Sequence, residues 1–295
     1  MDLYKFAVVF LLAVHVQADG RLAALTKLKQ VYASGASSDG PSVNIGCVMK
    51  NCLTQSFGCL ASSVCRNAMS CAQKCLDMWD NDTTSEKIKV QNCSNACAFT
   101  FVDKAYENFM ECVSDHDCIA FPPIPNTCRA PNVHPQKMLS LQDMNGSWWV
   151  MKGLNPVYDC YPCQHLSMAP INKTTWAYRP KYQVHLTNGS LLLVSQEMLL
   201  PNTSAPGENI SFVYHDVGLD HYETWWLLDK ANDGSYMTMY YCGNTLQWYY
   251  EGAIVLARNK TLDKDAYSNI ASSFQKAVGL DLTKFCDVSI SNCPD

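Results

Sequence analysis

The segment GSWWVMKGLNPVYDCYPCQ, residues 146–164, opens the part of the chain that reads as strands and turns. From here on, short apolar and aromatic runs alternate with turn residues such as Asn188-Gly189 and Asp233-Gly234. The runs that predict strands are 148–152, 182–186, 191–198, 210–215, 224–228, 236–241 and 253–257. Because no helical pattern separates them, we expect a mainly β domain, either a closed up-and-down barrel or a sandwich.

After the last strand the period of the pattern changes. Tyr267, Ile270, Phe274 and Val278 fall on one helical face, and Gly279 is a typical stop. A barrel followed by one amphipathic helix resembles the lipocalin plan. The Gly-x-Trp motif at 146–148 and Arg258 near the last strand also resemble that family. We therefore expect a lipocalin-type eight-stranded up-and-down β-barrel with a C-terminal α-helix.

A block of cysteines precedes the barrel and predicts a small α-helical, disulfide-rich domain. Ten of the chain's sixteen cysteines belong to it: Cys47, Cys52, Cys59, Cys65, Cys71, Cys75, Cys93, Cys97, Cys112 and Cys118. Helix-friendly spans cover 63–74 and 94–108, and two cysteine pairs lie four residues apart, on one helical face. Zinc is the competing interpretation, but no spacing in the block matches a zinc ribbon. We expect disulfides, an oxidising compartment and no metal.

The N-terminus predicts a secretory signal. An apolar run at 6–14 precedes Ala18, and it is too short for a transmembrane helix. We divide the chain into a signal peptide (1–18), a short helix and linker (19–43), a cysteine-rich domain (44–121), a Pro-rich linker (122–138), the barrel (139–262) and a C-terminal helix with a disulfide tail (263–295).

Eight Asn-X-Ser/Thr sequons support secretion as a glycoprotein. They begin at Asn81, Asn92, Asn145, Asn172, Asn188, Asn202, Asn209 and Asn259. The formal charge is only −5 and the 22 lysines and arginines are scattered, so no nucleic-acid partner is expected. The oligomeric state stays open, with a homodimer among the alternatives.

The segment 146–164 closely resembles the start of the barrel in the violaxanthin de-epoxidase family. Further landmarks follow in the family's order: Tyr214-His215-Asp216, His221-Tyr222, Trp226, Tyr240-Tyr241-x-Gly243, Trp248 and Val255-x-x-Arg258. The cysteine block has nearly the family's spacing, so the resemblance covers residues 47–293.

The resemblance implies a barrel that binds a long carotenoid, and an enzyme that reduces epoxide end groups with ascorbate as co-substrate and no bound cofactor. It also implies a plastid thylakoid lumen as the alternative location to the extracellular space. Tyr241 matches the family's catalytic tyrosine, Gln196 resembles a glutamine of the barrel, and His215 resembles a histidine linked to acid activation, so the resemblance implies that all three belong to the ligand site. We expect Trp248 and Met239 to line the cavity beside them. Asp159 is kept, whereas Pro162 replaces a second acidic residue.

One departure from the family argues against catalysis. We place the family's catalytic aspartate at Thr224, next to Glu223. Successive strand side chains point to opposite faces, so if Thr224 faces the cavity, Glu223 should face out. Tyr249 replaces a second family aspartate. We therefore expect ligand binding with weak or no catalysis. The alternative is an active de-epoxidase that uses Tyr241, Glu223 or Thr224. Thiol exchange at Cys160 and Cys163 is a third, weaker hypothesis.

The resemblance also implies disulfide pairs. These are Cys47–Cys65, Cys52–Cys59, Cys71–Cys97, Cys75–Cys93 and Cys112–Cys118, with Cys163 paired to Cys293. The partners of Cys128, Cys160, Cys242 and Cys286 are left open.

Overall fold

The computed structural model describes residues 42–76, 84–120, 128–132, 140–202, 209–216, 218–245, 249–291 and 293. The chain divides into two compact units, one of residues 1–123 and 217–219 and the other of residues 124–216 and 220–295. The predicted signal, the helix expected at 21–32, Asn81, Trp248 and most of the Pro-rich linker lie outside the described residues.

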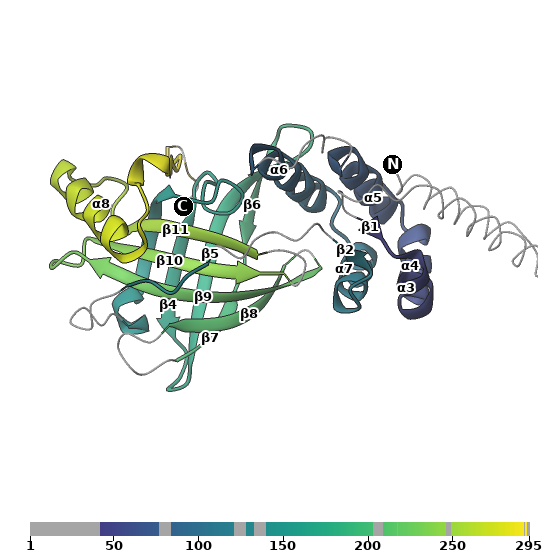
Figure 1. Cartoon of the computed structure of the whole chain (residues 1–295), viewed down its shortest axis with the longest axis horizontal. Helices are drawn as coiled ribbons and strands as arrows, with labels where there is room; N and C mark the ends of the chain where they lie inside the picture. The colour runs from purple at the N-terminus through teal and green to yellow at the C-terminus, as the bar shows by residue number, and fades with distance from the viewer. Residues whose placement is uncertain are drawn as a thin grey trace, which may run out of the picture. The chain divides into compact units, whose positions relative to one another are not determined.

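The first unit is a set of short helices (Figure 1), and five disulfides join them. Its elements are β1 (Ser42–Val43), α3 (Ile45–Asn51), α4 (Leu53–Ala61), α5 (Ser63–Leu76), α6 (Thr84–Thr100), α7 (Lys104–Asp115) and β2 (Ile119–Ala120). The helix expected at 94–108 is two helices. Asp103 separates them because its side chain accepts the backbone N–H of Tyr106 at 2.8 Å, which caps α7.

Three of the expected disulfide pairs in this unit are wrong. The structure joins Cys47 to Cys118, Cys52 to Cys112 and Cys59 to Cys65, in place of Cys47–Cys65, Cys52–Cys59 and Cys112–Cys118. The reason is tertiary: β1 pairs with β2, which brings the two ends of the unit together. Cys71–Cys97 and Cys75–Cys93 link α5 to α6 as expected.

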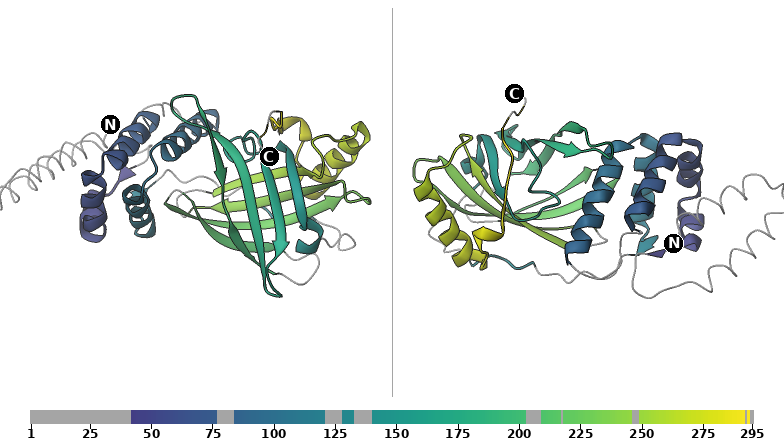
Figure 2. Two further views of the ribbon diagram at one scale, coloured as in Figure 1. Left: turned by 180° about the vertical axis from the view of Figure 1, so that it is seen from behind. Right: turned by 90° about the horizontal axis from the view of Figure 1, so that it is seen from above.

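The second unit is an antiparallel sheet curled into a barrel (Figure 2). Its strands are β3 (Gly146–Gly153), β4 (His165–Pro170), β5 (Thr175–His185), β6 (Leu191–Ser195), β7 (Met198–Pro201), β8 (Ile210–Asp216), β9 (Leu219–Lys230), β10 (Tyr236–Asn244) and β11 (Tyr249–Ala257). The order is β6-β5-β4-β3-β11-β10-β9-β8, and β7 continues the β6 edge by pairing with β5. This succession of eight neighbouring strands confirms the expected lipocalin-type barrel.

No strand was predicted at β4, and one strand was predicted at 191–198 where the structure has β6 and β7. His165–Pro170 is short, without an extended apolar run, and it ends in proline, so it carries a weak strand signal. The run expected at 191–198 is interrupted at Gln196 and Glu197, after which β7 continues along β5.

The C-terminal helix α8 (Lys264–Val278) covers the outer face of the barrel. Its Ile270 and Phe274 are fully buried against side chains of β10 and β11, and Gly279 ends it with φ of 72°. The short strand β12 (Cys286–Asp287) then pairs with β3. No helix of the described residues is long and apolar enough to cross a membrane.

The remaining disulfides close the second unit. Cys163 pairs with Cys293 as expected, Cys160 pairs with Cys286, and Cys128 pairs with Cys242. Cys160 and Cys163 therefore bond to different partners and do not form a Cys-x-x-Cys disulfide with each other.

The strand β10 shows which side of the sheet is the interior. Met237, Met239 and Tyr241 face the barrel, whereas Tyr236 and Tyr240 pack in the separate cluster that includes α8. The fully buried or nearly buried interior cluster comprises Leu141, Met144, Trp148, Val150, Leu166, Met168, Trp176, Leu200, Ile210, Phe212, Trp225, Met237, Met239, Tyr241, Tyr250, Ile254, Leu256 and Val288. Tyr241, Met237 and Met239 therefore share the inner face of β10.

Candidate active site

The carboxylate of Glu223 lies inside the barrel. Along β9, His221, Glu223 and Trp225 are buried, and Trp225 belongs to the interior cluster. Thr224 points the other way, with its hydroxyl 2.9 Å from that of Ser211 on the neighbouring strand. The expectation that Thr224 faces the cavity and Glu223 faces out is therefore wrong. Side chains along β9 do alternate between the two faces. Because Trp225 is buried in the interior cluster, Glu223 faces the interior with it and Thr224 faces away.

Three donors surround the Glu223 carboxyl group. The Tyr250 and Tyr214 hydroxyls donate to Oε1 at 2.8 and 3.1 Å, and the Trp225 indole N–H donates to Oε2 at 2.7 Å. Burial raises the pKa of Glu223 above its ordinary value, while these three hydrogen bonds favour the ionised form and lower it. The net shift is upward, so Glu223 keeps its proton to a higher pH than an exposed glutamate.

A second buried carboxyl group belongs to Asp159, in the loop between β3 and β4. Its Oδ1 accepts the Tyr241 hydroxyl at 2.6 Å, and its Oδ2 accepts the backbone N–H groups of Asn155 and Ala253 at 2.8 and 3.2 Å. Burial raises the pKa of Asp159 to about 7, and the charge of Glu223 adds to the rise. Asp159 therefore takes up a proton near neutral pH.

Glycines make room for these side chains. Tyr241 lies opposite Gly252, and Tyr250 lies opposite Gly243, in the β10–β11 pairing. A Cβ atom at Gly252 would overlap the Tyr241 ring, and one at Gly243 would overlap the Tyr250 ring. Each tyrosine thus folds over the glycine of the facing strand. An isolated glycine in a strand indicates such a close approach, but Gly243 and Gly252 lie just outside the predicted runs 236–241 and 253–257, so the sequence did not reveal it.

His221 extends the group around Glu223. Its Nδ1 is 3.1 Å from the Tyr250 hydroxyl oxygen, and its ring stacks on Tyr214 with centroids 4.6 Å apart. Burial lowers the pKa of His221 to about 4, so the imidazole is neutral above that pH. We call Glu223, Tyr214, Tyr250 and His221 the Glu223 cluster.

Further tyrosines line the same end of the barrel. The Tyr158 ring lies 5.1 Å from that of Tyr250, and the Tyr178 ring packs edge-on against Trp225 at 5.0 Å. Burial raises the pKa of Tyr178, Tyr241 and Tyr250 well above the ordinary value. These phenols are neutral, so they act as hydrogen-bond groups and not as charges.

The other residues expected in the site are spread out. Tyr241 and Met239 lie in the interior cluster. The Gln196 side chain donates to Asp216 at 2.8 Å, at the break between β6 and β7. His215 is exposed and pairs with Asp220 at 3.2 Å. Sequence reasoning did not select Asp159, Tyr214, Tyr250 or His221 as site residues.

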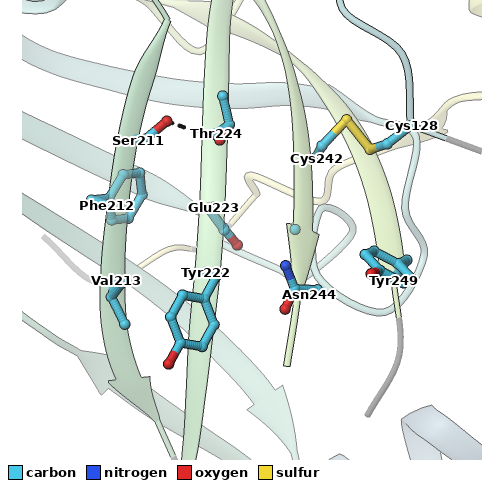
Figure 3. A pocket seen from close by; sticks show the side chains of 11 residues that line it. Cys128, Ser211, Phe212, Val213, Tyr222, Glu223, Thr224, Cys242, Asn244 and Tyr249 are labelled. Atoms are coloured by element: carbon cyan, nitrogen blue, oxygen red, sulfur yellow. Dashed lines mark hydrogen bonds between the residues drawn. A yellow bond between two sulfur atoms is a disulfide. The ribbon is translucent and has the colours of Figure 1, made fainter. Parts of the chain in front are cut away.

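A groove of about 440 Å³ lies along β8 to β11, beside the Cys128–Cys242 disulfide (Figure 3). Ser211, Val213, Tyr222 and Thr224 line it from the alternate positions that face away from the interior cluster. The hydrogen bonds of the Glu223 carboxyl group are to side chains inside the barrel. Phe212 and Glu223 also line the groove, so it borders the Glu223 cluster as well as the positions that face outward.

Metal binding has little support in the described part of the chain. There, the only group of three or more His, Cys, Asp or Glu side chains close enough to share an ion is Cys75, Cys93 and Cys97. All three form disulfides, so they offer no thiolate.

The eight-stranded meander, the helix on its outer face and the Arg258 guanidinium 3.5 Å over the Trp148 ring define a lipocalin. The family model of the VDE lipocalin domain matches residues 44–290, and the chain belongs to this family. Chloroplastic violaxanthin de-epoxidase of Spinacia oleracea is 26% identical over 253 residues, and that of Nicotiana tabacum is 25% identical over 255 residues. Each match covers 81% of this chain and 49% of the relative. The chain thus spans about half the length of these curated relatives.

Solved lipocalin structures are also similar. Apocrustacyanin C1 is 16% identical with a TM-score of 0.43, and the match covers 58% of this chain and 96% of that one. The siderocalin Ex-FABP is 11% identical with a TM-score of 0.39, covering 52% of this chain and 99% of that one.

Proposed function

We propose that the barrel binds a long apolar molecule with an oxygenated end group, and that the chain reduces an epoxide on that end with ascorbate. The observation that carries this proposal is the buried Glu223 carboxyl group among the donors of the interior. The relatives named violaxanthin de-epoxidase support a carotenoid epoxide as the substrate. Lipocalins bind hydrophobic ligands, and the methionines and tryptophans of the interior cluster suit a long hydrocarbon.

The reaction needs an acid at the ring oxygen. Reduction of an epoxide forms a C=C bond as both C–O bonds break, and the oxygen leaves as water. Ascorbate supplies two electrons and two protons and becomes dehydroascorbate. Protonated Glu223 donates to the ring oxygen, since burial keeps this carboxyl protonated to a higher pH. Asp159 and Tyr241 form a second acid–phenol pair that contacts the oxygenated end.

A carrier without catalysis is the second candidate. It is favoured by the tight network around Glu223, in which both carboxylate oxygens already accept hydrogen bonds from protein side chains. A carrier would retain its pigment through purification, whereas an enzyme would release product.

The test compares native protein with Glu223→Gln and Thr224→Val, using violaxanthin in lipid micelles, ascorbate and chromatography of the pigments. Glu223→Gln should lower the rate by about 10²- to 10⁴-fold, the usual effect of removing a general acid. Thr224→Val should leave it within about twofold, because Thr224 faces away from the interior. Tryptophan quenching by violaxanthin reports binding separately. Quenching without any turnover by the native protein across pH 4–8 would favour the carrier.

A further inference from the structure

His221, Tyr250 and Glu223 form a continuous line of hydrogen bonds inside the barrel. The Tyr250 hydroxyl is 2.8 Å from Glu223 Oε1 and 3.1 Å from His221 Nδ1. All three side chains are buried, with exposed fractions of 8% for Tyr250, 4% for His221 and 8% for Glu223. Epoxide reduction with Glu223 as the acid gives this buried histidine no role.

The number of hydrogens that these three side chains carry limits how they can bond to one another. A phenol has one hydrogen, so Tyr250 donates either to Glu223 or to His221. If Glu223 is ionised, Tyr250 donates to it and His221 Nδ1–H donates to Tyr250. If Glu223 is protonated, it donates to Tyr250, which donates to a bare Nδ1. The two arrangements differ by one proton moved from His221 through Tyr250 to Glu223.

The proposed reaction creates a need for such a transfer. Two protons end on the oxygen that leaves as water, and Glu223 can carry only one at a time, so it must regain a proton before it donates again. After the first donation Glu223 is ionised and buried, and burial makes that state unfavourable. A neutral imidazole can take a proton at Nε2 and give one up at Nδ1, so it transfers a proton without holding a charge.

We propose that His221 and Tyr250 are positioning residues that relay a proton to Glu223 and so restore the acid between the two protonation steps. This inference rests on the proposed function, because it assigns a role within the same reaction. The proton that enters His221 at Nε2 comes from water, and ascorbate returns a proton to water as it is oxidised, so the overall reaction still converts epoxide and ascorbate to alkene, dehydroascorbate and water.

The titratable groups that face this line come from several strands and from the β3–β4 loop. Tyr214, from β8, donates to Glu223 and stacks on His221. Asp159, from the β3–β4 loop, bonds to Tyr241 of β10 and to two backbone N–H groups. Tyr158, from the same loop, contacts the rings of His221 and Tyr250, and Tyr178, from β5, contacts Trp225. At the surface next to His221, Asp220 pairs with His215.

The test uses His221→Phe, His221→Gln and Tyr250→Phe in the full chain, with violaxanthin and ascorbate. Each variant should lower kcat by about 10²-fold, the lower end for general acid–base catalysis, with KM unchanged. Glutamine is the decisive substitution, since its amide can donate to Tyr250 but cannot relay a proton. In mixtures of H₂O and D₂O, the native rate should depend non-linearly on deuterium content, and the His221 variants should show a linear dependence.

Native-like turnover of His221→Gln would overturn the relay and leave His221 a hydrogen-bond role only. Absence of turnover by the native protein would instead refute the proposed function, and infrared spectroscopy then tests the relay alone. The carboxylic acid band that disappears in Glu223→Gln should titrate at a different midpoint in His221→Phe. An unchanged midpoint would contradict coupling between His221 and Glu223.

Discussion

At the scale of single residues, the site depends on which of two neighbours faces inward. Glu223 and Thr224 are adjacent, and the pattern of a strand indicates only that they face opposite sides. Trp225 in the interior cluster decides the question, because Trp225 and Glu223 share a face. Tyr241 and Met239 could be predicted, since Tyr241 matches a family position and the methionines of β10 alternate with polar or aromatic residues.

Asp159 should make stability depend on pH. Its folded-state pKa of about 7 lies above the ordinary value of 3.8, so the folded protein binds the extra proton between these values. Asp159 should therefore lower the free energy of unfolding as pH rises from about 4 to about 7, by at most about 1.4 kcal/mol for each pH unit, whereas His221, with its pKa lowered to about 4, raises it over much of the same range. Urea unfolding at several pH values measures this slope. The slope in Asp159→Asn should be more positive than in the native protein, and an equal slope in the variant would show that Asp159 does not titrate in this range.

At the scale of secondary-structure elements, the β10–β11 pair shapes the site through its glycines. Gly252→Ala would place a methyl group against the Tyr241 ring, which cannot move without breaking its hydrogen bond to Asp159. We expect a loss of about 1–3 kcal/mol in stability, the usual effect of overpacking. Gly58→Ala is the matched control. Nothing lies near its Cβ and it sits within α4, so alanine should stabilise by about 1 kcal/mol.

Thermal unfolding of both variants measures the contrast. A Gly252→Ala protein as stable as the native one would show that the tyrosine has room to shift.

The helix α8 and strands β10 and β11 were predictable because their patterns run over many residues. The break at Asp103 was not, because one capping side chain decides it.

At the scale of the whole molecule, all sixteen cysteines form eight disulfides, which fit an extracellular or lumenal compartment. Non-reducing peptide mapping of protein made in a secretory host should find Cys47–Cys118 and Cys52–Cys112. Recovery of Cys47–Cys65 would contradict this arrangement of the helical unit.

The same maps, with and without glycosidase, test glycosylation at exposed sequons such as Asn145, Asn188 and Asn259, and a mass unchanged by the enzyme would argue against it.

The amino-acid sequence by itself determined the class of fold, the two-part division, the C-terminal helix and the family, because these follow from periodicities and motifs that are local in the chain. Only the tertiary structure decided the disulfide partners, the inward orientation of Glu223 and its contacts with Tyr214, Tyr250 and His221. Cys52 and Cys112 are 60 residues apart, and Glu223 and Tyr250 are 27 apart. Such pairs meet only when helices pack and strands curl into a barrel, and no local pattern specifies which distant residues then come into contact.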